Sequence, residues 1–266
     1  MRLPLAGALG DTGLAVSRLG LGGHTFLQQY GGLERACDAE LRAIVTTALE
    51  AGLNYFDVTY DEERVQLGVI ARELGLRDRI ILSAWMSREH TQTAAAVVAE
   101  AERALSLLQM DHVDILYLDW TCTAEQVAAM VTLRERGLTR CLGLLGQGTA
   151  EASDLSEIDV LLVNHNYFWR DREPGLRKLA GDHPDTGLVC LEPLGRGRFA
   201  ADEAPGLPVV AACLKYALAF EPADTVLVAV RTLDQLQANL ALWQGDLSLT
   251  EPEWEALEAS AGYGAG

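Results

Sequence analysis

Lysine is nearly absent from this chain. Only Lys178 and Lys215 occur among its 266 residues, and both fall within helical patterns. Cysteine is sparse as well, because the five cysteines lie far apart and none has C-x-x-C spacing. This argues against a metal–thiolate site and favours reduced thiols. We therefore expect a cytoplasmic protein without a metal centre.

Long apolar runs and excess basic charge are also missing. No stretch of 18 or more apolar residues occurs, so no membrane span is expected, and the first residues lack the pattern of a secretory leader. Aspartate and glutamate number 38 against 21 basic residues, which gives a net charge of −17. Such an acidic surface repels nucleic acid and anionic membranes. A small molecule is the expected partner, and the sequence specifies no oligomeric state.

Short apolar segments alternate with amphipathic ones along the whole chain. Strands are predicted over 17–23, 53–58, 79–85, 112–120, 139–146, 158–168, 186–197 and 224–231, and helices over 36–52, 63–76, 93–110, 124–137, 208–220 and 233–244. Eight apolar strands alternating with helices are typical of a parallel sheet covered by helices. With no linker in the chain, we predict one domain, 1–266, folded as a (β/α)8 TIM barrel.

Catalytic groups of such barrels lie at the carboxyl ends of the strands. These positions hold His24, Asp57, Trp85, Asp119, Trp120, Gly146, Asn164, Glu192 and Arg231. Tyr60 follows shortly after Asp57, so an acid and a phenol stand together at one strand end.

Four segments resemble the aldo-keto reductase family. "LGDTGLAVSRLGLGG" is similar to its opening hairpin and first strand, and "AGLNYFDVTY" to the block that carries its catalytic Asp and Tyr. "MDHVDILYLDW" is similar to the strand that carries its catalytic His, and "VLVAVRTLDQLQANL" to its cofactor-binding segment. The resemblance implies a barrel with a short N-terminal β-hairpin that binds NADPH and reduces carbonyl groups.

The resemblance also shows where this chain departs from the family. Asp57 matches the catalytic Asp and Tyr60 the catalytic Tyr, but Trp85 stands at the Lys position and Asp119 at the His position. Neither lysine of the chain offers a replacement, because both lie in helices expected on the outer ring.

The cofactor residues that the resemblance implies are kept in part. The nicotinamide end is eroded: Leu145 and Gly146 replace a Ser-Asn pair, Leu191 replaces a stacking aromatic residue, and Asn164 replaces a glutamine. The phosphate and adenine end matches better, through Arg196, Arg231, Gln235 and Asn239. The expected cofactor is therefore either none or NADP.

Carboxylates dominate the rim in this reading, namely Asp57, Asp61, Glu62, Glu63, Asp119 and Glu192. Neighbouring carboxylates repel, so one is expected to hold its proton to higher pH. His24 is expected either to pair with Asp119 or Asp57 or to be a structural histidine. Trp85, Trp120, Asn164 and Glu192 are the expected substrate contacts. Ligand types for a divalent metal are present, but no spacing enforces such a site.

Three functions follow from these residues. The favoured prediction is an enzyme that has lost redox chemistry and uses Asp57, Tyr60, Asp119 and His24 for acid–base work such as elimination, isomerisation, cyclisation or hydrolysis. The alternative is an NADPH-dependent carbonyl reductase with an atypical proton donor. A non-catalytic binding or regulatory protein is the second alternative.

Overall fold

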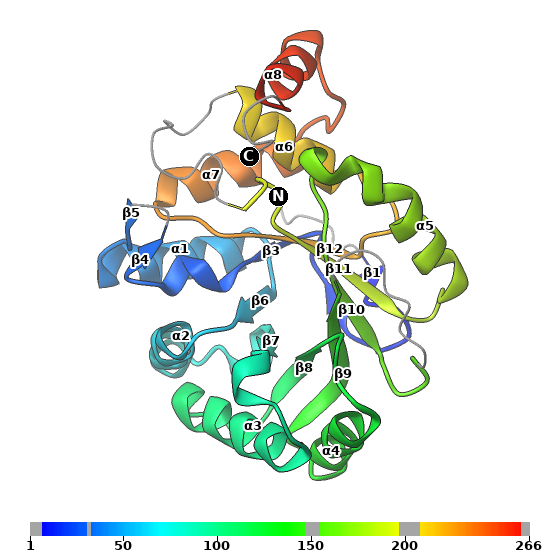
Figure 1. Ribbon diagram of the computed structural model, residues 1–266. Helices are drawn as coiled ribbons and strands as arrows, with labels where there is room; N and C mark the ends of the chain where they lie inside the picture. The colour runs from blue at the N-terminus through cyan, green and yellow to red at the C-terminus, as the bar shows by residue number, and fades with distance from the viewer. Residues whose placement is uncertain (1–6, 31–32, 147–154, 197–207, 262–266) are drawn as a thin grey trace.

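Eight parallel strands form a closed barrel at the centre of this computed structural model (Figure 1). The structure describes residues 7–30, 33–146, 155–196 and 208–261. The strands run around the barrel in the order β10-β11-β12-β3-β6-β7-β8-β9. Their bounds are β3 Leu19–Leu21, β6 Tyr55–Val58, β7 Ile81–Trp85, β8 Val113–Asp119, β9 Thr139–Gly146, β10 Val160–Asn164, β11 Gly187–Leu191 and β12 Thr225–Val228. The predicted (β/α)8 barrel is confirmed.

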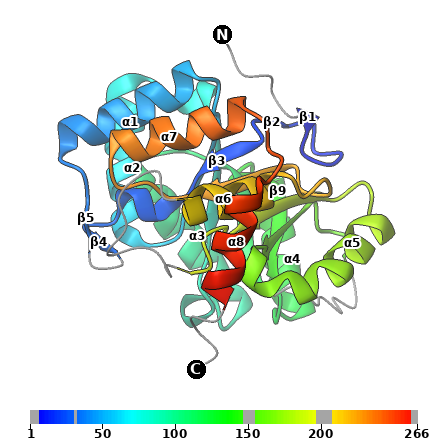
Figure 2. The same ribbon diagram turned by 90° about the horizontal axis from the view of Figure 1, so that it is seen from above.

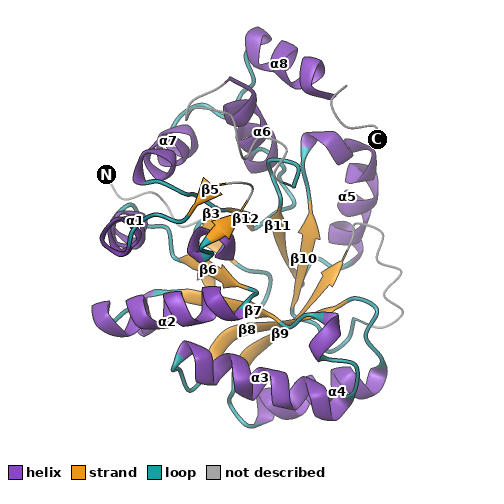
Figure 3. Ribbon diagram, turned by 60° about the vertical axis from the view of Figure 1, so that its left-hand side comes forward, coloured by secondary structure: helices purple, strands orange, loops and turns teal. Residues whose placement is uncertain are grey.

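Helices surround the strands on the outside (Figure 3). They are α1 Asp38–Glu50, α2 Asp61–Leu74, α3 Ala94–Leu108, α4 Ala124–Glu135, α5 Glu173–Asp182, α6 Pro208–Leu218, α7 Leu233–Gln244 and α8 Glu251–Ala261. Short 3-10 helices occur at η1 Gly23–Phe26, η2 Arg77–Arg79, η3 Arg88–His90 and η4 Tyr167–Arg172. Helix α8, which the sequence pattern did not predict, lies against α6 (Figure 2). Within the described ranges, no helix is both long and apolar enough to cross a membrane.

Two short antiparallel hairpins accompany the barrel. Strands β1 Gly7–Ala8 and β2 Ala15–Val16 form the N-terminal hairpin that the family resemblance implied. Strands β4 Gln29–Tyr30 and β5 Leu33–Glu34 form a second hairpin between β3 and α1, which was not predicted.

The N-terminal hairpin closes the end of the barrel at which the strands begin, here called the lower end. Leu9, Leu14 and Val16 are buried in one cluster with interior residues of the strands. The turn residue Gly10 has φ +47°, and a Cβ there would collide with the backbone at Gly187, so glycine is required for this close approach. The amide of Asp11 donates to the Asp185 carbonyl at 2.8 Å. The hairpin therefore seals this end with apolar side chains.

Alternation along the strands decides which side chains enter the barrel. Tyr55 and Tyr117 belong to the interior cluster, and their hydroxyl groups lie 3.0 Å apart. The ring of Tyr117 lies where a Cβ of Gly143 would stand, so the neighbouring strand carries a glycine. Because successive strand residues face opposite sides, residues two positions further along each strand also point inward, one layer nearer the carboxyl end.

Candidate active site

The upper layer of the interior holds the predicted lumen residues. Asp57 follows Tyr55 by two positions, Asp119 follows Tyr117, and Asn164 follows the interior residue Leu162. Trp85 pairs in register with Tyr117 and therefore has the same orientation. All four side chains stand at the carboxyl ends of their strands, where barrel enzymes carry their chemistry.

Asp57 is buried beneath this rim. Only 7% of the residue is exposed, and the hydroxyl group of Ser83 donates to its carboxylate at 2.5 Å. Burial raises the pKa of Asp57 to about 7, and the Glu63 carboxylate adds to the increase while His24 and Arg64 oppose it. Asp57 therefore changes its protonation state near neutral pH.

His24 contacts a carboxylate other than the two expected ones. Its Nδ1 lies 2.8 Å from Oε1 of Glu63, and the Glu63 side chain is fully buried. The prediction of a pair with Asp119 or Asp57 was wrong, because η1 packs against the start of α2, which brings Glu63 to His24.

Two tyrosines flank the His24 ring. The ring centroid of Tyr30 lies 4.3 Å away, and that of Tyr60 lies 5.7 Å away in a stacked arrangement. Tyr60 is 51% exposed, whereas burial raises the pKa of Tyr30, with the nearby Glu192 carboxylate adding to the increase. The phenols of Tyr30 and Tyr60 and the imidazole of His24 thus form one group at the rim.

The remaining rim carboxylates do not crowd together as bare anions. Asp119 accepts hydrogen bonds from the amide of Thr121 at 3.0 Å and from its hydroxyl group at 2.6 Å. Glu192 accepts from Nε of Arg196 at 3.0 Å. Asp61 pairs with Arg103, whose hydrogen bond lowers the Asp61 pKa. Each of these three groups has a donor of its own, whereas Glu63 adds to the raised pKa of Asp57, as expected for neighbouring carboxylates.

Two lumen side chains present polar atoms that have no partner. The amide oxygen of Asn164 and the indole nitrogen of Trp85 are buried, and neither makes a hydrogen bond within the described ranges. Asn164 is 5% exposed, so water does not readily replace a partner. Trp120 differs, since it is 39% exposed beyond the end of β8. Asn164 and Trp85 are therefore the better candidates for contacting a bound molecule.

The two lysines lie on the outer ring, as expected. Lys178 pairs with Asp182 on α5, and Nζ of Lys215 lies 2.7 Å from Glu253 on α8. Arg64 is a buried cation whose charge acts on Asp57. It is 1% exposed, bonds Glu100 at 2.6 Å, and donates to the Trp85 carbonyl at 3.0 Å.

The residues expected to bind the cofactor lie around the start of α7. Arg231 donates to the carbonyl groups of His24 at 2.6 Å and Gln28 at 3.3 Å. Its own amide donates to Gln235 at 2.6 Å. Burial, followed by the nearby Arg35 cation, lowers the pKa of Arg231. Two guanidinium groups therefore share this region.

Asn239 and Arg196 complete the predicted cofactor set. Asn239 is 8% exposed on α7. Arg196 is 62% exposed, has φ +63°, and bonds only the Glu192 carboxylate among the described residues. Arg196 lies on the β11 loop and not with the α7 group.

Four residues of this site were missed or given no role by the sequence reasoning. Ser83 was detectable, because it precedes Trp85 by two positions and so shares its inward direction. Glu63 was named only as a rim acid. Tyr30 lies on the unpredicted β4–β5 hairpin, and Arg64 is a charged residue buried between α2 and α3, so neither gave a local signal.

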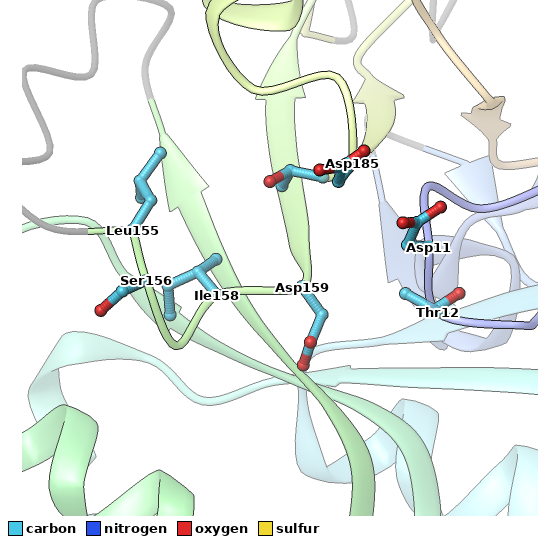
Figure 4. A pocket seen from close by; sticks show the side chains of 8 residues that line it. Asp11, Thr12, Leu155, Ser156, Ile158, Asp159 and Asp185 are labelled. Atoms are coloured by element: carbon cyan, nitrogen blue, oxygen red, sulfur yellow. The ribbon is translucent and has the colours of Figure 1, made fainter.

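A separate hollow of about 240 Å³ lies at the opposite end of the barrel (Figure 4). Its polar lining includes Asp11, Asp159 and Asp185, which come from the hairpin turn and the starts of β10 and β11. Asp159 already accepts the Leu142 amide at 2.7 Å. In the described part of the chain, no three His, Cys, Asp or Glu side chains are grouped as a metal ion requires.

Comparison with known proteins agrees with the fold. Residues 18–210 match the profile of the aldo/keto reductase family. This chain belongs to the aldo/keto reductase family. It is 24% identical to L-galactose dehydrogenase of Arabidopsis thaliana, over 88% of this chain and 86% of that protein. It is 24% identical to an aldo-keto reductase of Bacillus subtilis, over 68% of this chain and 60% of that protein.

Solved structures of the family share the architecture. A holo-form aldo-keto reductase from Bacillus halodurans superimposes with a TM-score of 0.75 at 20% identity, over 97% of this chain and 96% of that one. Family members normally use NADP(H) and act on small molecules.

The favoured prediction of non-redox acid–base chemistry was wrong. The family and the curated relatives are named for reduction and dehydrogenation, which agrees with the alternative prediction of an oxidoreductase. The prediction assumed that the rim carboxylates oppose hydride transfer, whereas Asp61, Asp119 and Glu192 each have a hydrogen-bond or ion-pair partner.

Proposed function

We propose that this protein is an NADP(H)-dependent oxidoreductase that interconverts a carbonyl group and the corresponding alcohol on a small molecule. The observation that carries the proposal is the buried, unpartnered amide oxygen of Asn164 on the lumen wall. A buried acceptor without a donor costs about 1–3 kcal/mol, so a ligand that supplies an N–H group is favoured there.

The residues present fit a nicotinamide dinucleotide. Asn164 is the position at which the family resemblance implied an amide contact to the nicotinamide carboxamide, and the carboxamide supplies the N–H group that its oxygen lacks. At the other end, Arg35 and Arg231 bring two cations to the start of α7. Nη1 of Arg35 donates to Asp38 at 2.9 Å, while its Nε is buried and makes no hydrogen bond within the described ranges. A phosphate group would offset the repulsion between these guanidinium groups.

When bound, the reduced nicotinamide supplies the hydride. The protein must then hold the carbonyl carbon near that hydride, exclude water and deliver one proton to the carbonyl oxygen. Tyr60 and His24 are the proton-carrying groups at the rim, and Asp57 lies beneath them with a pKa of about 7. Trp85, Trp120 and Glu192 are proposed to line the substrate side, and Asp119 to shape it from β8.

A polyhydroxylated aldehyde or its alcohol is the substrate class to test first. The relative from Arabidopsis thaliana is named for dehydrogenation of L-galactose. The buried indole N–H of Trp85, which has no partner within the described ranges, suits a substrate rich in oxygen acceptors. We also propose that residues 1–266 act as one catalytic domain, and that the five cysteines are reduced in a cytoplasmic location.

Cofactor binding tests the proposal without knowledge of the substrate. The protein is titrated with NADPH and with NADH while the fluorescence of the bound nicotinamide is followed. We expect micromolar or tighter binding of NADPH and weaker binding of NADH. Arg35→Gln should weaken NADPH binding about tenfold and leave NADH unchanged, because only NADPH carries the extra phosphate.

The matched control is Arg42→Gln, which removes an arginine of α1 that pairs with Glu73 at 2.7 Å. It should leave both affinities unchanged. Asn164→Leu should weaken NADPH and NADH equally, because both carry the carboxamide. Absence of NADPH binding at millimolar concentration would overturn the proposed function. If NADPH binds, oxidation of it by aldoses and simple aldehydes is then followed by absorbance.

A further inference from the structure

The two carboxylate oxygens of Glu63 have different partners, and only one of them contacts His24. Oε1 of Glu63 lies 2.8 Å from Nδ1 of His24. Oε2 of Glu63 accepts the amide of Thr59 at 2.5 Å and the amide of Tyr60 at 3.1 Å. One carboxylate oxygen is therefore committed to two backbone donors, and the other faces the imidazole.

Packing holds the Glu63 carboxylate in this orientation. Its side chain has no exposed surface. A Cβ at Gly23 would collide with the carboxylate and with the Asp57 carbonyl, so a glycine directly before His24 is required for the contact. Gly23 and the first turn of α2 thus enclose the carboxylate, and neither oxygen can exchange places without breaking backbone hydrogen bonds.

The opposite edge of the His24 ring is available for chemistry. The side chain is 31% exposed although Nδ1 is turned toward a fully buried group. Nε2 makes no hydrogen bond to any residue in the described ranges. Tyr30 and Tyr60 flank the ring and hold its plane.

We propose, on the basis of the oxidoreductase function above, that Glu63 is a positioning residue that fixes the proton of neutral His24 on Nδ1 and makes Nε2 the group that exchanges the proton of the reaction. Glu63 also stabilises the imidazolium form through a charge-assisted hydrogen bond. This pair takes the place of the Lys and His that are absent at Trp85 and Asp119.

In reduction, the carbonyl carbon would gain the hydride that a bound reduced nicotinamide supplies, and that cofactor would lose two electrons. The carbonyl oxygen gains the proton from Nε2 of the His24 imidazolium, which becomes neutral with its remaining proton on Nδ1. Solvent then returns one proton to Nε2. Oxidation of an alcohol runs the same transfers in reverse, with neutral Nε2 as the base.

The groups that face His24 come from several elements. They are Glu63 and Tyr60 from the start of α2, Tyr30 from β4, Asp57 from β6, and Arg231, which binds the His24 carbonyl. A pH profile of the reaction therefore reports this group as a whole. A direct readout of His24 is needed to isolate the contribution of Glu63.

Glu63→Gln provides that readout, because it inverts the hydrogen-bond pattern. Two backbone N–H groups require an oxygen at the Oε2 position, so the amide NH2 of Gln faces His24 Nδ1. Nδ1 then becomes an acceptor, and the proton of neutral His24 moves to Nε2. Side-chain ¹⁵N chemical shifts distinguish the two tautomers in protein labelled at histidine nitrogen, without cofactor or substrate. His24→Gln assigns the resonances.

Glu62→Gln is the matched control. Glu62 is the preceding residue of the same helical turn, is exposed, and accepts the amide of Gln28 instead of contacting His24. The expected result is a proton on Nδ1 in the wild type and in Glu62→Gln, and on Nε2 in Glu63→Gln. A proton that stays on Nδ1 in Glu63→Gln, or that lies on Nε2 in the wild type, would overturn the positioning role.

Kinetics then test whether the pair serves the reaction. Glu63→Gln and His24→Gln should each lower kcat about 100-fold with little change in KM or in NADPH affinity, and Glu62→Gln should change neither. An inverted tautomer with unchanged kcat would overturn the proton-transfer role and assign it to Tyr60, which Tyr60→Phe then tests. Failure of the wild type to bind NADPH would instead refute the proposed function, and the tautomer result would still decide the positioning role.

Discussion

At the scale of single residues, the burial of Asp57 makes the stability of the fold depend on pH. Its folded-state pKa of about 7 lies above its unfolded value of 3.8, so the folded protein binds more protons between these values. Stability contributed by the protonated form is present below pH 3.8 and is lost as pH rises through 7. An ionised Asp57 therefore destabilises the fold at alkaline pH.

Asp57→Asn should raise stability by about 2–4 kcal/mol at pH 8, because Asn mimics the protonated carboxyl group beside Ser83. The gain should shrink as pH falls toward 4. Urea unfolding at a series of pH values measures it, with the exposed Asp78→Asn as the control. An equal change in stability at pH 8 and pH 4 would contradict the raised pKa.

At the scale of elements, a buried ion pair joins two helices behind the site. Arg64 on α2 and Glu100 on α3 are 1% and 4% exposed and lie 2.6 Å apart. Arg64 also binds the Trp85 carbonyl at the end of β7, so the pair connects both helices to a strand of the barrel. Removal of Glu100 leaves the buried Arg64 guanidinium with the exposed Asp61 carboxylate at 3.3 Å as its remaining ion-pair partner in the described part of the chain, which compensates a buried charge poorly.

Glu100→Leu should therefore cost about 3–5 kcal/mol of the free energy of unfolding. The double variant Arg64→Met/Glu100→Leu should recover more than half of that loss, because no bare charge remains. The control is Glu102→Leu, also on α3, which breaks an exposed ion pair with Arg136 at the end of α4. It should cost less than about 1 kcal/mol of the free energy of unfolding. A double variant no more stable than Glu100→Leu would refute this interpretation.

Element-level patterns were also where the sequence was most informative. The strands of this barrel are apolar on both faces, so their number and order were readable, and alternation then placed Asp57, Trp85, Asp119 and Asn164 in the lumen. The His24–Glu63 contact was not readable. It depends on how η1 and the first turn of α2 meet in space, and no periodicity records that. Arg64 was hidden for a similar reason, because a charged residue in a helix normally predicts a solvent-exposed face.

At the scale of the whole molecule, the net charge of −17 opposes compaction. The melting temperature should rise by a few degrees between 10 mM and 300 mM NaCl, because salt screens repulsion across the surface over about one Debye length. Sorbitol at matched osmolality is the control for effects unrelated to charge. A melting temperature that falls with salt would mean that surface ion pairs outweigh the net repulsion.

The hairpin that closes the lower end of the barrel has a consequence for the order of events in turnover. With Leu9, Leu14 and Val16 filling that end, every molecule that reaches the lumen enters and leaves through the same rim. If the nicotinamide lies against Asn164 at the lumen wall, a substrate arriving first would stand in its way. The reaction is then compulsory-ordered: cofactor is first on and last off, and product inhibition by the oxidised cofactor is competitive with the reduced one. At saturating substrate, kcat would then be set by the rate at which the oxidised cofactor dissociates past Tyr30, Tyr60 and His24 at the rim.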